Sequence, residues 1–335
     1  MSRTVAAPTL ILARVDVAAL MDAGEWLEAV ENGFAAAASG KASSPPPMAV
    51  DGRGGTFHAK GARIDLERRY VALKLNGNFP DNPGLRGLPT IQGALLLCDG
   101  ETGSLLAIMD SIEVTLQRTA AATALAARFL ARPDSRQILI CGCGEQANAQ
   151  LAALKAVLPL RSALAWDRDH DRSRAFAEEQ SDDGFFVEPA TDLAEASRAS
   201  DVIVTCTTAR SPFLEERFVR PGTFVAAVGA DSHEKSEVQP ALMRRALVVA
   251  DILDQCATMG DLHHAIAAGV MDRGDVHAEL SELVGGSKKG RCDDEQITLF
   301  DSTGTALQDV AAAALIYRRA IQAGAAKSIH LGAAV

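Results

Sequence analysis

The chain has 335 residues, of which 48% are hydrophobic and 23% charged, as is typical of a soluble globular protein with a large core. Its formal net charge of −10 disfavours a nucleic-acid-binding protein, because such proteins usually present a basic face. No apolar run approaches the roughly 20 residues of a membrane span. Arg14 and Asp16 also interrupt the segment where a signal peptide would need its apolar core. We therefore expect a cytoplasmic protein without membrane or nucleic-acid partners.

The cysteines predict neither a disulfide framework nor a metal site. Their six positions are scattered along the chain: Cys98, Cys141, Cys143, Cys206, Cys256 and Cys292. A disulfide framework is not expected in a cytosolic chain of this size. Cys141 and Cys143 have a C-x-C spacing, but no second pair and no suitably spaced histidine follows. We predict no metal.

The first third of the chain predicts a helix followed by strands. An amphipathic run over residues 26–38 favours a helix that ends before the serine and proline cluster at 43–47. The clearest strands are 70–75, 94–98 and 105–108. Residues 76–89, rich in glycine and proline, are interpreted as a long and functional loop.

From residue 111 onward helices and strands alternate. A long alanine-rich helix over 111–131 stops before Pro133. Strands are predicted at 138–141, 163–166, 185–187, 201–205, 223–228, 246–250 and 297–300, and helices at 146–158, 171–180, 192–198, 261–268 and 306–320. Such alternation predicts an α/β fold with a parallel sheet covered by helices. The simplest architecture is a nucleotide-binding domain over 120–303, inserted into a second domain formed by 1–119 and 304–335.

The segment 138–147, Ile-Leu-Ile-Cys-Gly-Cys-Gly-Glu-Gln-Ala, is the strongest local signal. It combines a buried strand, a glycine turn and the start of a helix, which is the order that a dinucleotide requires. Gly142 and Gly144 allow the backbone to approach a pyrophosphate, and the helix N-terminus offers free N–H groups. Gln146 and Ala147 complete the predicted phosphate cradle. An ordinary strand–turn–helix without a ligand is the alternative.

The next predicted strand ends in Asp167, 23 residues after Gly144. An acidic residue at about this distance binds the adenosine ribose of a dinucleotide. Arg168 complicates the prediction, because an arginine could instead meet the 2′-phosphate of NADP. The carboxylate of Asp167 would repel that phosphate, so NAD is favoured over NADP.

Several segments together resemble the ornithine cyclodeaminase/mu-crystallin family. They are Lys74 with Phe-Pro-Asp-Asn-Pro at 79–83, Gly-Leu-Pro-Thr-Ile-Gln-Gly at 87–93, Gln-Arg-Thr-Ala-Ala-Ala at 117–122, the glycine turn, Val-Gly-Ala-Asp at 228–231, and Phe-Asp-Ser-Thr-Gly-Thr-Ala-Leu-Gln-Asp at 300–309. They follow the family's order over residues 70–310, and the combination is more specific than any one block.

The resemblance implies a Rossmann-type domain that binds NAD(P) and a discontinuous α+β domain that binds substrate and builds a homodimer. It implies redox chemistry at the C–N bond of a small α-amino or α-imino acid, as in an imino-acid reductase or amino-acid dehydrogenase. Two alternatives stay open. One is a cyclodeaminase that releases ammonia and regenerates its cofactor, and the other is a non-catalytic protein that binds NAD(P)H and a small ligand.

Three residues are the main candidates for substrate chemistry. The resemblance places the substrate carboxylate at Arg118, where a guanidinium can form two parallel hydrogen bonds. Lys74 lies among apolar strand residues, where burial would lower its pKa and suit proton transfer. Asp231 follows a predicted strand at the edge where α/β sheets bind ligands, and the resemblance implies that an aspartate here handles the substrate's amino group and its protons. We expect all three to share one cleft with the nicotinamide. A surface ion pair for Arg118 and a helix cap for Asp231 are the alternatives.

The family's second carboxylate anchor, an arginine after a proline, is missing here, since Pro47 is followed by Met48. Lys60 could replace that charge from another strand. An extra cation would suit a substrate with a second carboxylate. Further cofactor contacts are predicted at Thr119, Thr205, Thr207, Ser302 and Gly304.

Overall fold

The computed structural model describes residues 8–324 and 326–331. The chain forms two compact units, one of residues Met1–Arg118 with Thr305–Val335 and one of Thr119–Gly304. The sequence analysis placed its domain boundaries one residue away from these. The first boundary falls inside a single helix, α4 (Ser111–Leu130), which begins in the first unit and ends in the second. Among the helices of the described residues, none is both long enough and apolar enough to cross a bilayer.

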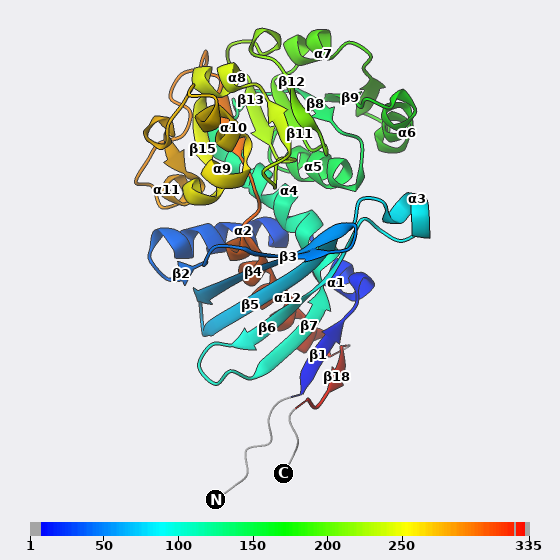
Figure 1. Ribbon diagram of the computed structural model, residues 1–335, viewed down its shortest axis with the longest axis vertical. Helices are drawn as coiled ribbons and strands as arrows, with labels where there is room; N and C mark the ends of the chain where they lie inside the picture. Colours follow the sequence, from blue (N-terminus) through cyan, green and yellow to red (C-terminus); the bar gives the residue numbers. More distant parts are fainter. Residues whose placement is uncertain (1–7, 325, 332–335) are drawn as a thin grey trace, which may run out of the picture. The chain divides into compact units, whose positions relative to one another are not determined.

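The first unit is built on a sheet with the strand order β18-β1-β7-β6-β5-β4-β2, and β3 also pairs with β4 (Figure 1). Its strands are β1 (Thr9–Leu12), β2 (Ala42–Ser43), β3 (Met48–Gly52), β4 (Gly55–Asp65), β5 (Arg69–Asn78), β6 (Ile91–Asp99), β7 (Leu105–Asp110) and β18 (Lys327–Ile329). Its helices, besides the start of α4, are α1 (Arg14–Leu20), α2 (Ala23–Ala38), α3 (Asn82–Arg86) and α12 (Ala306–Ala323). In the described part, the strand pairs are antiparallel except for β1 with β7.

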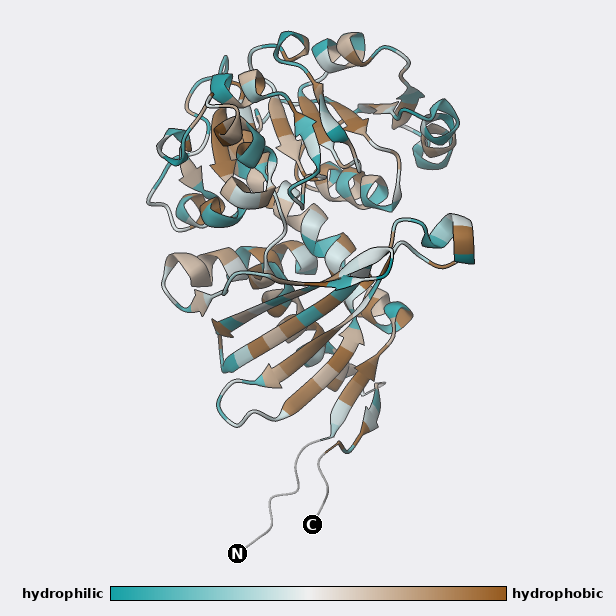
Figure 2. Ribbon diagram, in the orientation of Figure 1, coloured by the Kyte–Doolittle hydropathy of each residue, from teal (hydrophilic) through white to brown (hydrophobic). Residues whose placement is uncertain are grey.

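The two faces of this sheet differ sharply. Successive residues of a strand point to opposite faces, and along β5 Ala72 and Lys74 are buried whereas Leu73 and Leu75 are 52% and 50% exposed. The buried face packs against α12, which lies behind the sheet in Figure 1. No described residue covers Leu73 and Leu75 on the other face, and hydrophobic segments run along its strands in Figure 2.

One prediction for this unit is wrong. Residues 76–89 were expected to form a loop, but β5 continues to Asn78 and α3 occupies 82–86. The reason is pairing on both sides, because Asn76–Asn78 oppose residues of β4 and of β6. Strand pairing with distant segments outweighs the low strand propensity of asparagine and glycine.

The second unit is a parallel sheet with the order β10-β9-β8-β11-β13-β17-β15-β16. Its strands are β8 (Gln137–Cys141), β9 (Ser162–Trp166), β10 (Phe186–Pro189), β11 (Val202–Thr205), β13 (Phe224–Ala227), β15 (Leu247–Ala250), β16 (Ala278–Glu279) and β17 (Thr298–Asp301). A separate short pair is formed by β12 (Arg210–Leu214) and β14 (Ser236–Val238). The helices are α5 (Glu145–Lys155), α6 (His170–Gln180), α7 (Leu193–Ala199), η1 (Glu216–Phe218), α8 (Pro240–Arg245), α9 (Leu253–Met259), α10 (Asp261–Ala267), η2 (Arg273–Asp275) and α11 (Leu280–Val284).

The strand order of this sheet reverses between β8 and β11. The chain runs outward from β8 to β9 and β10, then returns to β11 on the other side. The loops after β8 and β11 therefore diverge at the carboxyl edge, where doubly wound sheets bind their ligands. The parallel sheet confirms the expected α/β fold of Rossmann type, with a core of fully buried strand residues such as Leu139, Ile203 and Val225.

Candidate functional site

The centre of the first unit holds a buried ion cluster formed by Lys74, Arg118 and Asp309, each no more than 5% exposed. Lys74 Nζ lies 2.9 Å from Asp309 Oδ1 and 2.7 Å from Oδ2, and it donates to Thr115 Oγ1 at 3.2 Å. Arg118 Nε donates to Asp309 Oδ1 at 3.0 Å. Strand β5, helix α4 and the first turn of α12 thus each supply one charged group. A helix N-terminus also favours a carboxylate such as that of Asp309.

The surroundings of Lys74 bring its pKa close to neutral pH. Burial lowers the pKa of Lys74 to about 7; the charge of Asp309 opposes this, and those of Arg118 and Lys60 add to it. Burial alone would raise the pKa of Asp309, but Lys74 and Arg118 hold it below its ordinary value. Asp309 is therefore a permanent anion, and Lys74 can gain or lose a proton near neutral pH.

Arg118 retains donors for a further anion. Its guanidinium has five N–H groups; Nε donates to Asp309, and Nη1 donates to Gln308 Oε1 at 2.8 Å. Gln308 Nε2 is buried and has no hydrogen-bond partner among the described residues. A carboxylate ligand could accept hydrogen bonds from both the Arg118 guanidinium and Gln308 Nε2, since each of its oxygens is an acceptor.

Lys60 lies on the same sheet face as Lys74. The two residues are direct partners in the antiparallel pairing of β4 with β5, so their side chains leave the sheet on one side. Lys60 is half-buried, and its charge acts on both Lys74 and Asp309. The first unit thus gathers three cations around the one carboxylate of Asp309.

In the second unit, the glycine turn has the geometry that a pyrophosphate needs. Gly142 has a φ of +97°, and an added Cβ would lie 2.8 Å from Thr207 Cγ2 and 2.9 Å from Cys206 O. Only glycine fits this turn, because the loop after β11 presses against it. Gly144 is the N-cap of α5 and makes no side-chain cap, so the positive end of the helix dipole faces the glycine turn, where it favours an anion.

The other predicted cofactor residues lie around this turn. Ala147 is fully buried at the first turn of α5, and Gln146 beside it is half-buried. Asp167 Oδ2 accepts a hydrogen bond from Cys143 N at 2.9 Å, so the end of β9 holds the glycine turn in place. Arg168 is exposed. Together these residues fit the phosphates and adenosine ribose of a dinucleotide.

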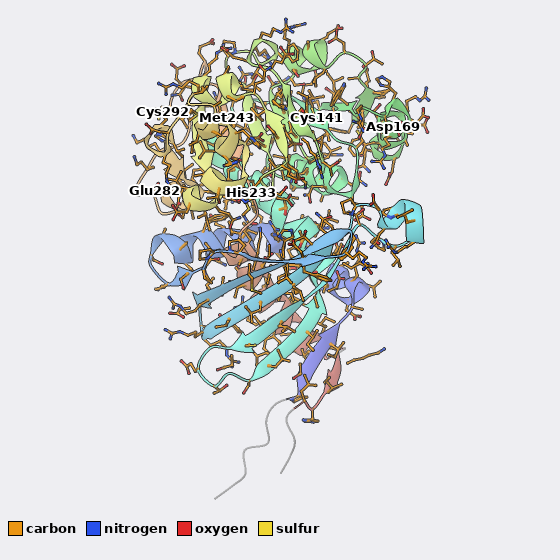
Figure 3. The ribbon with its side chains drawn as sticks, viewed as in Figure 1. Cys141, Asp169, His233, Met243, Glu282 and Cys292 are labelled. Atoms are coloured by element: carbon orange, nitrogen blue, oxygen red, sulfur yellow. The ribbon has the colours of Figure 1, made fainter. Side chains whose placement is uncertain are left out.

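Asp231 lies four residues after the end of β13, at the carboxyl edge of the sheet. It is 48% exposed, and its Oδ1 lies 2.6 Å from Lys235 Nζ. Among the residues labelled in Figure 3 are His233, in the same loop as Asp231, and Cys141 at the end of β8. An exposed carboxylate that pairs with a flexible lysine can exchange it for the ammonium or iminium group of a substrate.

Thr205 and Thr207 both bind a carboxylate that the sequence analysis did not identify. Thr205 Oγ1 donates to Glu237 Oε2 at 2.7 Å, and Thr207 Oγ1 donates to Glu237 Oε1 at 2.7 Å. Thr205 is fully buried, and Thr207 is half-buried. The two threonine hydroxyls therefore anchor the loop after β11 to the buried carboxylate of Glu237.

The loop after β17 carries the predicted cofactor residues Ser302 and Gly304, and the side chain of Asp251 binds its backbone. Its Oδ2 accepts from Thr303 N at 2.8 Å and from Gly304 N at 2.7 Å. Ser302 is 2% exposed and its hydroxyl is buried without a partner among the described residues, which leaves it available to a ligand. Thr119, the first residue of the second unit, is 8% exposed on α4.

Sequence reasoning missed Asp309, Glu237 and Asp251 as site residues. Asp309 stood within a recognised block, and the available signal was its place in the first turn of a helix that follows a glycine. Glu237 and Asp251 had no such signal, because their partners are backbone N–H groups and threonine hydroxyls of separate loops, from 8 to 53 positions away. Among the described residues, no cluster of histidine, cysteine and acidic side chains could hold a metal ion.

Comparison with known proteins identifies the family. The profile of the ornithine cyclodeaminase/mu-crystallin family matches residues 8–324. The chain belongs to this family. The resemblance predicted from the sequence is therefore confirmed.

Three solved members of the family are close to this chain in structure. An archaeal alanine dehydrogenase dimer with bound NAD has a TM-score of 0.93 and 37% identity, covering 97% of this chain and 100% of that one. The Δ1-pyrroline-2-carboxylate reductase of Thermococcus litoralis, in complex with NADH and L-proline, has a TM-score of 0.92 and 33% identity over 96% and 100%. The iminosuccinate reductase of Paracoccus denitrificans, in complex with NAD⁺, has a TM-score of 0.89 and 31% identity over 97% and 100%.

Proposed function

We propose that this chain is an NAD-dependent oxidoreductase that transfers hydride between the cofactor and the α-carbon of a small amino acid or its imine. The observation that carries the proposal is the buried cluster of Lys74, Arg118 and Asp309, in a chain whose second unit has a dinucleotide turn. The relatives confirm the expected NAD-dependent enzyme class, since they are dehydrogenases and reductases of amino or imino acids with NAD or NADH bound.

We assign substrate binding and proton transfer to different residues of the chain. Arg118 and Lys74 bind the substrate carboxylate, and Asp309 holds both cations in position. Asp231 stabilises the iminium or ammonium nitrogen and transfers protons together with Lys74, whose pKa is lowered to about 7. The nicotinamide supplies or accepts the hydride when the cofactor is bound. Fixed charges in a desolvated site supply much of the rate.

The identity of the substrate can be determined by testing a panel of candidate acids. We propose that Lys60 adds affinity for a second carboxylate on the substrate, because it stands beside Lys74 on the same face. The panel is pyruvate or oxaloacetate with ammonia, and Δ1-pyrroline-2-carboxylate, each with NADH and with NADPH. Stoichiometric NADH oxidation supports a reductase. Ammonia release from ornithine without net NADH change would indicate a cyclodeaminase, and binding of NADH without any turnover would indicate a binding protein.

The charge of Lys60 should affect how kcat depends on pH. In amino-acid oxidation Lys74 must be neutral to accept a proton, so kcat should rise with pH through the pKa of Lys74, about 7. The positive charge of Lys60 contributes to lowering that pKa, so K60M should move the rise in kcat to higher pH. K155M, a lysine on α5 that pairs with Asp182, is the matched control. An unmoved profile in K60M would contradict the assignment.

The glycine turn allows a clean test of dinucleotide binding. An added Cβ at Gly144 meets nothing within 4 Å, so G144A should fold with an unchanged Tm. A methyl group there would nevertheless stand where the pyrophosphate approaches, and the Kd for NADH should rise about tenfold or more, ~1.4 kcal/mol. Fluorescence titration with NADH measures this. Unchanged NADH affinity in G144A would place the pyrophosphate elsewhere.

We propose that the chain forms a homodimer through the uncovered face of the first sheet. Met48, Val50, Leu73 and Leu75 are each 50% exposed or more on this face, a patch that soluble monomers rarely leave open. One relative is itself described as a dimer.

We also propose a cytoplasmic location. All six cysteines are free, which supports it.

A charge on this face should break the dimer. L75E buries a carboxylate in the proposed interface and is expected to yield a monomer in multi-angle light scattering. V15E is the matched control, since Val15 is a 74% exposed residue on α1, and it should leave the mass unchanged. A dimeric L75E variant would exclude this face as the interface.

A further inference from the structure

A line of buried carboxylates runs through the second unit, outside the residues assigned to substrate or cofactor. Its members are Glu237, Asp261, Asp301 and Asp251, none more than 1% exposed. They come from β14, α10, the end of β17 and the residue after β15. Burying acidic groups is costly unless each is hydrogen-bonded, so their contacts define what they do.

Each carboxylate binds the backbone of the segment that carries the next one. Asp301 accepts from Asp261 N at 3.3 Å and from Leu262 N at 2.9 Å, at the start of α10. Asp261 Oδ1 in turn accepts from Glu237 N at 2.8 Å and from Val238 N at 3.0 Å. The position of each acidic residue is therefore fixed by the one before it.

The line ends at the loop that carries Asp231. Glu237 Oε2 accepts from Gly229 N at 2.8 Å, two residues before Asp231, and Oε1 accepts from Thr207 N at 2.6 Å. An added Cβ at Gly229 would lie 2.5 Å from Glu237 Oε1, so glycine is required for this close approach. At the other end, Asp251 binds the Ser302–Gly304 loop through Thr303 N and Gly304 N. Asp251 N donates to Asp301 O at 3.0 Å.

We infer that Glu237 is a positioning residue that fixes Asp231 for proton handling, and that the carboxylate line joins the Asp231 loop to the Ser302–Gly304 loop as one unit. This inference rests on the proposed function. Both oxygens of Glu237 are needed as acceptors, since each accepts one backbone N–H group and one threonine hydroxyl. A glutamine offers only one accepting oxygen and leaves two of these donors facing its NH₂ group.

The electrostatics agree with a tightly packed acidic line. Burial, followed by the charge of Asp261, raises the pKa of Glu237 to about 7. Burial also raises the pKa of Asp261 to about 6 and that of Asp301 well above its ordinary range. Burying these carboxylates close together is costly, and their hydrogen bonds offset that cost. The same hydrogen bonds fix the backbone geometry at the carboxyl edge of the sheet.

The test compares E237Q with D201N by kcat, KM for NADH and Tm. Asp201 is a matched control, because it also accepts from two backbone amides, Arg136 N and Gln137 N, but at the start of β11, the opposite edge of the sheet. Both variants should lower Tm. Only E237Q should lower kcat, by about tenfold or more, with KM for NADH changed less than threefold.

A double-mutant cycle with D231N separates positioning from general destabilisation. If Glu237 acts through Asp231, E237Q should cost little or no further activity once Asp231 is asparagine. The amide of Gly229 should also exchange hydrogen faster in E237Q, a readout independent of turnover. Equal loss of kcat from E237Q in both backgrounds, or wild-type kcat and Gly229 exchange in E237Q, would overturn the inference. Wild-type enzyme without turnover on any substrate would instead refute the proposed function, with the Gly229 exchange still testing Glu237.

Discussion

D231N is expected to lower kcat by about 10²- to 10⁴-fold, the range for loss of a group that transfers a proton in the rate-limiting step. The asparagine keeps the size of the side chain but cannot hold a proton or stabilise a cationic nitrogen. The carboxylate is 48% exposed and forms an ion pair with Lys235 near the surface, so the fold depends little on its charge. Steady-state kinetics at saturating NADH and imino acid measure the loss, and Tm should stay near that of the wild type.

The control for D231N is E234Q. Glu234 is an exposed acidic residue in the same loop and pairs with Arg210 at the surface, so its loss should leave kcat within twofold. Equal losses in D231N and E234Q would mean that the loop tolerates no change, and a wild-type kcat in D231N would remove Asp231 from the mechanism.

R118K is expected to lower kcat/KM by about 10²- to 10³-fold, mainly through a higher KM for the amino or imino acid. Lysine keeps the positive charge but loses the planar pair of donors that aligns a carboxylate. It also gives up the contact from Arg118 Nη1 to Gln308. The KM for NADH should change little, because Arg118 lies in the first unit and the glycine turn in the second.

R128K is the matched control for R118K, as Arg128 lies further along the same helix, α4, and is exposed. Its kinetics should be those of the wild type. An R118K enzyme that keeps its KM for the acid would show that the substrate carboxylate binds elsewhere. A parallel rise in the KM for NADH would point to a general disturbance of α4.

The parallel sheet was predictable because its strands are short apolar runs bounded by turns. The runs at β8, β11 and β13 were located to within one or two residues. Strands that depend on distant pairing were not predicted. β1 is a four-residue strand that exists because it pairs with β7 and β18, nearly 100 and 320 residues away. Non-local pairing of this kind leaves no periodic signal in the sequence.

The same distinction applies to the site. Lys74 was predictable because a lysine between apolar strand residues requires an explanation, and Gly142 because its turn follows a buried strand. The partners that give these residues their properties were not, since Asp309 lies 235 positions from Lys74. Glu237 and Asp251 bind backbone amides and threonine hydroxyls of neighbouring loops, and no motif spacing indicates such contacts.

The most direct test of the proposed chemistry follows the hydride itself. NADH carrying deuterium at the transferred position of C4 is supplied with an imino acid from the panel, and the product is analysed by mass spectrometry and NMR. Direct transfer predicts one deuterium at the α-carbon of the amino acid and one NAD⁺ formed for each product molecule. Product without deuterium at the α-carbon, using NADH labelled at either face of C4, would contradict the account.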